Sequence, residues 1–314
     1  MKITLLDAET LGRDLDLSSL EALGELTTYA TTSPDETLQR IVDTEIIITN
    51  KVVITAEIME QSPTLKLICI AATGMNNVDL QAAEKKGIIV KNVAGYSTQS
   101  VVQHTFTMAL YLLEKMAYHD EVVKSGAWSG SGIFTDISHP FYEIAGKKWG
   151  IIGLGTIGRE VAKVATAFGA KVSYYSTSGT NLEQEYPHQS LTVLLGECDI
   201  ISIHCPLNQQ TQNLINKSNL NHIKDDAVLL NLGRGGIINE ADLAEEIDSR
   251  PLYAGLDVVA KEPIERDNPL MNIQNSERLL ITPHIAWASK EARVKLLEGI
   301  VANIKGVKDM HGTS

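Results

Sequence analysis

An arginine, a glutamate and a histidine follow three successive apolar segments in the last part of the chain. They are Arg234 after residues 227–232, Glu262 after residues 253–258 and His284 after residues 279–282. Arginine can bind a carboxylate through two parallel hydrogen bonds, and histidine can give a proton to a carbonyl oxygen and take it back. A glutamate beside the histidine would favour its protonated form and fix its orientation. Beside a nicotinamide, these groups would reduce a 2-keto acid to a 2-hydroxy acid.

Each of these residues also has a purely structural explanation. Arg234 lies among glycines and could cap the end of a helix, Glu262–Pro263 is typical of a turn, and His284 could stabilise a strand end. The occurrence of all three after consecutive strands favours the chemical interpretation. In an open parallel sheet, the carboxyl ends of the strands form the edge at which ligands bind.

A glycine-rich turn lies in the middle of the chain. Residues 153–158 match the G-x-G-x-x-G pattern between an apolar strand and an amphipathic helix, which is the setting of a dinucleotide-binding turn. Gly153 permits the tight turn, Gly155 lets a pyrophosphate approach the backbone, and Gly158 lets the helix pack close to the strand. The pattern therefore predicts a cofactor site, and the alternative is a structural turn.

The helix that follows this turn begins at Thr156 and Ile157. Its first N–H groups have no partner within the helix, and its dipole is positive at this end, so both attract an anion. An acidic chain can thus bind a pyrophosphate locally.

The residue at the end of the second strand of this unit bears on the choice of cofactor. An acidic residue about 20 positions after the glycines usually binds the ribose hydroxyls, but Ser176 stands there. Serine does not repel a 2′-phosphate, yet no Arg or Lys follows closely to attract one. The residues leave both NAD and NADP open, and we expect NAD in preference.

The elements that must position these residues alternate between apolar segments and helical patterns. After residue 148, six apolar segments predict a complete dinucleotide-binding sheet: 149–152, 172–175, 200–204, 227–232, 253–258 and 279–282. In the first hundred residues, the predicted strands are 3–6, 46–48, 67–71 and 88–90, and the predicted helices are 18–26, 34–42, 55–61 and 78–86. The alternation predicts an α/β fold with two doubly wound, largely parallel sheets.

Two further segments connect these series. A helical pattern at about 97–116 is predicted to join the two domains. The Gly- and Ser-rich segment 125–139, which contains Trp128 and Phe134, is either a surface loop or a subunit contact.

Composition excludes several classes of function. The 314 residues suggest two domains, and the net charge of −12 argues against nucleic acid or an anionic membrane as a partner. Cys69, Cys198 and Cys205 show no C-x-x-C spacing, so neither a zinc site nor a disulfide framework is expected. We predict no metal site, no membrane span and a cytoplasmic location.

In combination, the motifs resemble those of the D-isomer-specific 2-hydroxyacid dehydrogenase family over essentially the full length. Thr73-Gly74 is similar to the family's substrate-carboxylate loop. The segments similar to its arginine, glutamate and histidine motifs are 231–236, 256–263 and 282–288. Within the last of these, Ile285-Ala286-Trp287-Ala288 resembles the glycerate dehydrogenase/hydroxypyruvate reductase branch.

The resemblance implies a role for each residue of the chemical site. Arg234 would bind the substrate carboxylate and keto oxygen, His284 would be the acid/base, and Glu262 would orient it. Thr73 and Gly74 would bind the carboxylate through their backbone N–H groups.

The resemblance also implies contacts at the edges of the site. Tyr96 either reaches the substrate side chain or packs at the hinge. Asp257 would hold the nicotinamide carboxamide, and the backbone of His204, Cys205 and Pro206 would run along the cofactor, with Thr211 nearby.

Finally, the resemblance implies the domain organisation and partners. A flavodoxin-like substrate domain, residues 1–97 and 288–314, would flank a Rossmann dinucleotide-binding domain, residues 98–287. The ligands would be NAD or NADP and a small 2-keto acid such as hydroxypyruvate or glyoxylate, and the assembly a homodimer. A corepressor-like module that senses the cofactor on the same fold is the alternative function.

Overall fold

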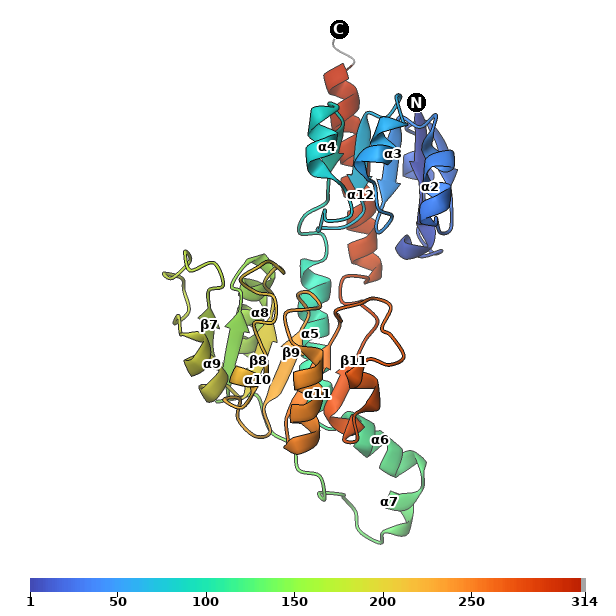
Figure 1. Ribbon diagram of the computed structural model, residues 1–314. Coiled ribbons are helices and arrows are strands. Elements are labelled where there is room, and N and C mark those ends of the chain that lie inside the picture. Colours follow the sequence, from blue (N-terminus) through green and yellow to red (C-terminus); the bar gives the residue numbers. More distant parts are fainter. Residues whose placement is uncertain (312–314) are drawn as a thin grey trace. The chain divides into compact units, whose positions relative to one another are not determined.

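Two parallel β-sheets, each covered by helices, make up the chain (Figure 1). The computed structural model describes residues 1–311, with side chains through Val307. One unit comprises Met1–Ser97 and the chain from Ala288 onward, and the other comprises Thr98–Trp287. The α/β fold with two doubly wound sheets that the sequence predicts is confirmed.

The first unit has a five-stranded sheet in the order β2-β1-β3-β4-β5, which is the flavodoxin-like arrangement. All neighbouring strands are parallel. The strands are β1 (Lys2–Leu5), β2 (Glu25–Thr28), β3 (Ile46–Thr49), β4 (Leu67–Ile70) and β5 (Ile89–Lys91). The helices are η1 (Ala8–Leu11), α1 (Ser18–Glu21), α2 (Pro34–Ile41), α3 (Ala56–Glu60), α4 (Leu80–Lys85) and α12 (Lys290–His311).

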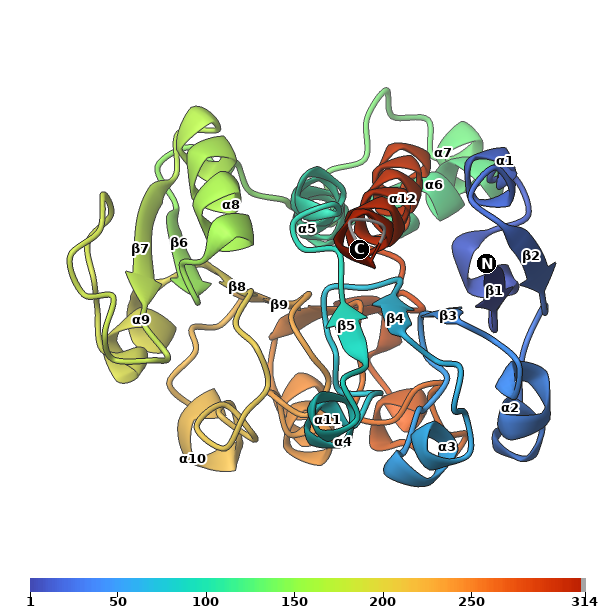
Figure 2. The ribbon, with the colours of Figure 1, turned by 90° about the horizontal axis from the view of Figure 1, so that it is seen from above.

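Helices cover both faces of this sheet, so its central strands are apolar and fully buried. Figure 2 shows α2, α3 and α4 on one face and α1 and α12 on the other. Ile41, Met59 and Ala83 from the first group pack with Ile47 and Ile68 of the strands. The final helix thus completes a sheet that the first hundred residues build.

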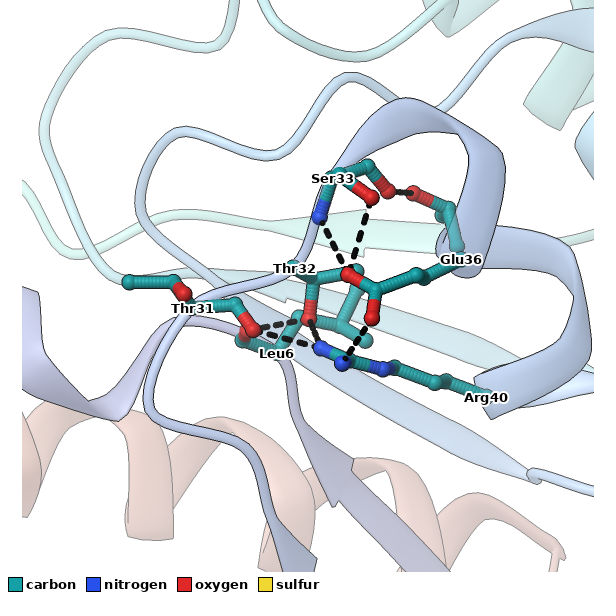
Figure 3. Close-up of polar contacts among 7 residues, drawn as sticks. Leu6, Thr31, Thr32, Ser33, Glu36 and Arg40 are labelled. Atoms are coloured by element: carbon teal, nitrogen blue, oxygen red, sulfur yellow. Dashed lines mark hydrogen bonds and ion pairs between the residues drawn. The ribbon is translucent and has the colours of Figure 1, made fainter.

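A capping network fixes the start of α2 (Figure 3). The Glu36 carboxylate accepts hydrogen bonds from the Ser33 backbone N–H at 3.0 Å and the Ser33 hydroxyl at 2.8 Å. Arg40, one turn later, donates to Glu36 at 2.6 Å and to the Thr32 hydroxyl at 2.6 Å. The Thr32 hydroxyl in turn donates to the Leu6 carbonyl at 2.5 Å, which ties the helix to the end of β1.

The predicted helix 18–26 is wrong in its second half. Only Ser18–Glu21 is helical, and Glu25–Thr28 forms β2. Within residues 1–311, this strand pairs only with β1 at the sheet edge, and none of its four residues is buried. An edge strand exposed to solvent carries no apolar run, so the sequence gives no strand signal there.

The second unit has a six-stranded parallel sheet in the order β11-β10-β9-β8-β6-β7. The strands are β6 (Lys148–Ile152), β7 (Lys171–Tyr175), β8 (Ile200–Ile203), β9 (Val228–Asn231), β10 (Tyr253–Leu256) and β11 (Leu279–Ile281), which confirms the six predicted strands. The helices are α5 (Thr98–Leu113), α6 (Met116–Lys124), α7 (Ala127–Gly130), α8 (Thr156–Ala167), α9 (Leu191–Glu197), α10 (Lys217–Leu220), α11 (Glu240–Ser249), η2 (Pro269–Asn272) and η3 (Ser276–Arg278).

The order of this sheet reverses between β6 and β8, and β7 lies outside β6. A parallel bridge from Tyr174 to His188 extends the edge beyond β7. Figure 2 shows α5 and α8 on one face and α9, α10 and α11 on the other. Trp149 of β6 is fully buried beneath α5 and α8 and donates to the Ser202 hydroxyl at 2.9 Å.

The predicted helix 97–116 ends earlier, because Lys115 adopts a left-handed conformation with φ of 50°. A new helix, α6, starts at Met116, and α7 follows in the Gly- and Ser-rich segment. We call residues 116–142 the arm, which extends away from the rest of the second unit in Figure 1.

Candidate active site

Three neighbouring strands position the predicted catalytic residues. Arg234 follows β9, Glu262 follows β10 and His284 follows β11. The strands are parallel and adjacent in the sheet, so their carboxyl ends meet at one edge. Arg234 and His284 are 50 positions apart in the sequence, with Glu262 between them, and the structure places all three on the same edge of the second sheet.

His284 and Glu262 are in direct contact. His284 Nδ1 lies 2.7 Å from Glu262 Oε2. Glu262 Oε1 accepts a hydrogen bond from the Val259 backbone N–H at 3.3 Å. An ionised carboxylate only accepts hydrogen bonds, so Nδ1 of the imidazole carries a proton and Nε2 is the nitrogen available for exchange with a ligand. Both side chains are partly exposed, at 25% for His284 and 33% for Glu262, as a ligand-facing pair must be.

The backbone of His284 is in the left-handed conformation, with φ of 54°, which residues other than glycine rarely adopt. Such a conformation costs about 1 kcal/mol and persists only where the surroundings impose it. Here the surroundings are the buried Asp257 carboxylate. It accepts hydrogen bonds from the Thr282 hydroxyl at 2.6 Å, the Ile285 N–H at 2.8 Å and the Ala286 N–H at 2.9 Å. One carboxylate therefore holds the chain on both sides of the histidine.

Arg234 lies in a loop that is closed by Asn231. The buried Asn231 amide accepts from the Gly233 N–H at 3.1 Å and donates to the Arg234 carbonyl at 2.9 Å. Gly235 is packed so tightly that a Cβ would lie 1.8 Å from the Val259 carbonyl oxygen. The Arg234 guanidinium donates to the Gly233 carbonyl and, within the described residues, forms no ion pair. The Arg234 guanidinium therefore has N–H groups left to donate at the carboxyl edge of the second sheet.

The three glycines of the 153–158 turn differ in their surroundings. Gly153 has φ of 93°, and a Cβ there would lie 2.8 Å from Cys205. A Cβ at Gly158 would lie 2.3 Å from the Gly153 carbonyl oxygen, so the helix approaches the turn closely. By contrast, no described atom lies within 4 Å of the Cβ position at Gly155, where α8 begins at Thr156 without a side-chain cap.

This open helix terminus fits a dinucleotide. The amide groups at Thr156 and Ile157 lie at the start of α8, at the point where the strand order reverses between β6 and β8. Both features are those of a pyrophosphate site in a doubly wound sheet. The residues present therefore suit NAD or NADP.

The loop after β8 lines the same switch point. Thr211 is fully buried and closes this loop, because its hydroxyl donates to the Pro206 carbonyl at 2.7 Å and accepts from the Asn208 N–H at 2.8 Å. Cys205 is buried against Gly153, and burial raises the pKa of its thiol to about 12. Cys205 is therefore a packing residue and not a nucleophile.

His204, at the start of this loop, has two buried ring nitrogens, neither of which has a hydrogen-bond partner among the described residues. Burial lowers the pKa of His204 to about 3, so the ring is neutral. Buried polar atoms usually have a hydrogen-bond partner. The two ring nitrogens of His204 therefore have unused capacity to bind a polar group beside this loop.

The loop after β7 carries hydroxyl groups in place of an acid. Ser176 is buried, its oxygen lies 3.4 Å from that of Ser178, and Ser178 lies 2.9 Å from the Thr180 hydroxyl. Arg159 of α8 reaches the same loop and donates to Gln184 at 3.0 Å. The residues that follow β7 do not reveal this cation, because Arg159 lies on α8, which precedes β7 in the chain.

Thr73, Gly74 and Tyr96 belong to the first unit. The loop after β4 is held by Asn92, which donates to the Thr73 carbonyl at 2.6 Å, and by the Thr73 hydroxyl, which donates to the Val93 carbonyl at 3.4 Å. Thr73 is exposed, and Gly74 and Tyr96 are partly exposed. Tyr96 lies between β5 and α5.

Comparison with known proteins identifies the family. Residues 106–286 match the model of the NAD binding domain of D-isomer specific 2-hydroxyacid dehydrogenases. A hydroxypyruvate reductase of Blautia hydrogenotrophica is 40% identical over 97% of this chain and 96% of its own. A glycerate dehydrogenase of Methylorubrum extorquens is 35% identical over 97% of this chain and 95% of its own. The chain belongs to the D-isomer-specific 2-hydroxyacid dehydrogenase family.

A solved structure shows the same architecture. An acyclic imino acid reductase in complex with NADPH and D-Arg superposes with a TM-score of 0.86 at 30% identity, over 99% of this chain and 98% of that one. The 2-hydroxyacid dehydrogenase described here is an NAD(P)-dependent oxidoreductase of the glycerate dehydrogenase/hydroxypyruvate reductase branch. None of the relatives named here supports the corepressor-like alternative.

The described residues contain neither a candidate metal site nor a candidate membrane span. Among residues 1–311, no three His, Cys, Asp or Glu side chains group in a way that could hold a metal ion. In the same part of the dehydrogenase, no helix combines the length and the apolar character needed to cross a bilayer.

The neutral state of His204 predicts a pH dependence of stability. The unfolded chain takes up a proton on His204 below about pH 6.5, whereas the folded chain does so only near pH 3. This stability contribution is therefore complete above about pH 6.5 and falls as the pH drops through that value. Urea unfolding of the cofactor-free protein at about pH 8 and about pH 5.5 measures it. We expect His204→Leu to reduce the difference between the two pH values by about 1 kcal/mol.

The exposed His222 supplies the control, and His222→Leu should leave the pH difference as it is in the wild type. An identical pH dependence in His204→Leu and the wild type would show that His204 is accessible to protons in the folded state.

Proposed function

We propose that this dehydrogenase reduces small 2-keto acids, with hydroxypyruvate and glyoxylate as the leading candidates, to D-2-hydroxy acids with NADH or NADPH. The observation that carries the proposal is the 2.7 Å contact between His284 Nδ1 and Glu262 Oε2, on the sheet edge that also carries Arg234 and the glycine turn. The names of the relatives support the substrate class.

His284 is the proposed acid/base. With Nδ1 bonded to Glu262, the Nε2 proton of the imidazolium is the one that can pass to the keto oxygen as the alcohol forms. The Glu262 carboxylate stabilises the imidazolium and fixes the plane of the ring. In the reverse direction the neutral Nε2 takes the hydroxyl proton back.

Arg234 is the proposed substrate clamp. Its guanidinium makes one hydrogen bond to its own loop, which leaves N–H groups for a carboxylate and for the keto oxygen. In the first unit, the backbone N–H groups of Thr73 and Gly74 are proposed to bind the substrate carboxylate, and Tyr96 is proposed to contact the substrate side chain. Their motif resemblance supports these roles.

The cofactor supplies the hydride when bound, and this chain's residues position it. Gly153, Gly155 and Gly158 shape the turn for the pyrophosphate, with the amide groups of Thr156 and Ile157 at the helix start. Further contacts are proposed for Ser176, His204, Cys205, Pro206, Thr211 and Asp257. Asp257 already accepts three hydrogen bonds from its own chain, and a carboxylate has about four acceptor positions, so one remains for the nicotinamide carboxamide.

The two units carry the two ligands in this proposal. Residues 98–287 form the dinucleotide-binding domain, supported by the family match at 106–286. Residues 1–97 and 288–314 form the substrate domain, supported by the substrate-carboxylate motif around Thr73.

We also propose that the protein is a homodimer in the cytoplasm. The arm exposes apolar side chains, including Phe134 at 89%, Ile137 at 81% and Ile133 at 63%. Several strongly exposed large apolar side chains in one short segment favour an interaction site, and hence the subunit-contact interpretation of residues 125–139. The three cysteines are free and buried, as suits a reducing compartment.

A panel of 2-keto acids tests the activity. We expect oxidation of NADH or NADPH on addition of hydroxypyruvate, glyoxylate, pyruvate or phenylpyruvate, with the first two fastest. His284→Ala should lower kcat by a factor of about 10² to 10⁴ while cofactor binding persists, because general acid catalysis is lost. His222→Ala replaces an exposed histidine and serves as the control. Turnover near the wild-type rate in His284→Ala would refute the acid/base role, and no turnover with any 2-keto acid would refute the proposed function.

Another prediction concerns the 2′-phosphate of NADP. The sequence alone leads us to expect NAD in preference. The hydroxyl groups of Ser176 and Ser178 and the cation of Arg159 favour acceptance of the 2′-phosphate, so we propose instead that NADPH serves as well as NADH. Arg159→Gln should raise KM for NADPH about tenfold, because a charge-assisted hydrogen bond is lost. KM for NADH should change less than about twofold. Lys163→Gln, on the same helix, is the control. Equal changes for both cofactors would show that Arg159 does not read the 2′-phosphate.

The third prediction concerns assembly. Light scattering on a sizing column should give a mass of about twice 34.2 kDa. The double variant Phe134→Lys, Ile137→Lys should give the single-chain mass, because charges would be buried at the contact. A wild-type protein that elutes with the mass of one chain would contradict the dimer, and an unchanged dimer in the double variant would show that the arm is not its interface.

A further inference from the structure

A second histidine lies behind the loop that carries His284. His104 is on α5, and 18% of its side chain is exposed. Its Nε2 lies 3.1 Å from the Thr282 hydroxyl and 3.6 Å from Asp257 Oδ1. The motifs in the sequence did not single it out, because it lies 180 positions before His284 on a helix that reads as a domain connection.

The direction of each hydrogen bond in this group can be assigned. The Asp257 carboxylate only accepts, so the Thr282 hydroxyl must spend its one proton on Asp257 Oδ1, at 2.6 Å. The Thr282 oxygen can then only accept from His104, which means that His104 Nε2 carries a proton. The result is a chain of donors from His104 through Thr282 to Asp257.

The end of this chain is the loop that positions His284. Asp257 accepts the N–H groups of Ile285 and Ala286, directly after the histidine with the left-handed backbone. Ser100, one turn before His104 on the same face of α5, donates to the Ala286 carbonyl at 2.6 Å. One face of α5 therefore contacts the loop at two points.

We propose that His104 is a positioning residue for the reduction: through Thr282 and Asp257 it holds the backbone of residues 282–286 so that the His284 imidazole keeps its contact with Glu262. This proposal rests on the proposed role of His284. His104 itself would touch neither substrate nor cofactor. Its N–H keeps the Thr282 hydroxyl pointed at Asp257 and polarises that hydroxyl, which strengthens the hydrogen bond from Thr282 to Asp257. This bond helps to hold the Asp257 carboxylate in the position from which it binds the Ile285 and Ala286 N–H groups.

Removal of the donor should act on the rate more than on binding. Without His104, the Thr282 hydroxyl can rotate away, Asp257 loses its aligned donor, and the 282–286 loop can relax toward an ordinary backbone conformation. A displacement of the acid/base by about 1 Å costs about 100-fold in rate. The glycine turn, which is proposed to bind the pyrophosphate, lies on other strands. Asp257 is only one of the proposed cofactor contacts, so cofactor affinity should fall much less than the rate.

The experiment compares His104→Leu, which removes the donor, with His104→Gln, whose amide can restore it. We expect His104→Leu to lower kcat for the preferred 2-keto acid about 10- to 100-fold, with a dissociation constant for the reduced cofactor that rises by no more than about threefold. A larger kinetic isotope effect with deuterated cofactor should accompany the loss, because the chemical step becomes limiting. The kcat of His104→Gln should be within about threefold of that of the wild type. Gln103→Leu replaces an exposed neighbour on the same helix, and its kcat should equal that of the wild type.

Thr282→Val breaks the chain of donors from His104 to Asp257 without a change in α5. It should reproduce the loss, and the double variant with His104→Leu should be no slower than the slower single variant, since both break one chain of contacts. A kcat within twofold of the wild type in His104→Leu, equal losses in the Leu and Gln variants, or additive losses in the double variant would each overturn the proposal.

A readout without substrate separates this proposal from the proposed function. Hydrogen–deuterium exchange of the cofactor-free protein should show faster exchange of the Ile285 and Ala286 amides in His104→Leu and protection close to the wild type in His104→Gln. Unchanged exchange in the Leu variant would overturn the positioning role even if the keto-acid panel succeeds. Faster exchange would support it even if every keto acid in the panel fails.

Discussion

The buried carboxylate of Asp257 is the interaction on which the site depends. It lies at the end of β10 with its side chain only 1% exposed, and it is surrounded by donors from the next strand's loop. A buried charge is tolerated only where hydrogen-bond donors compensate it. The hydrogen bonds therefore have two effects: they stabilise the Asp257 carboxylate, and they fix the backbone of the loop that supplies the donors. His284 lies in the middle of this loop, so the hydrogen bonds to Asp257 impose its left-handed backbone conformation.

The parallel sheet explains why distant residues share one edge. Each crossover returns the chain to the same side, so the loops after β6, β8, β9, β10 and β11 gather at the carboxyl ends of the strands. Here they bring together a helix start, Arg234 and the Glu262–His284 pair. These local dipoles and cations resolve the apparent conflict between anionic ligands and a net charge of −12. The overall charge governs long-range encounters, whereas binding depends on the groups within a few ångströms.

The sequence predicted the features that periodicity and spacing encode. All six strands of the second sheet appear as expected, since both faces are covered and the strands are uniformly apolar. The edge strand β2 was missed because it is not buried. Arg159 and His104 were missed for another reason: each acts on a loop far from it in the chain. A motif records residues that are close in sequence, and only the fold brings a helix side chain beside another element's loop.

In the proposed function, the carboxyl edge of the second sheet presents an acid/base and a carboxylate clamp to a 2-keto acid. A crystal structure of the dehydrogenase with the reduced cofactor and oxamate, an unreactive analogue of a 2-keto acid, tests it most directly. We predict that His284 Nε2 and the Arg234 guanidinium both donate hydrogen bonds to the analogue, with the His284–Glu262 contact retained. An analogue bound out of reach of both side chains, or a His284 that turns its Nε2 away from the analogue, would contradict these two roles.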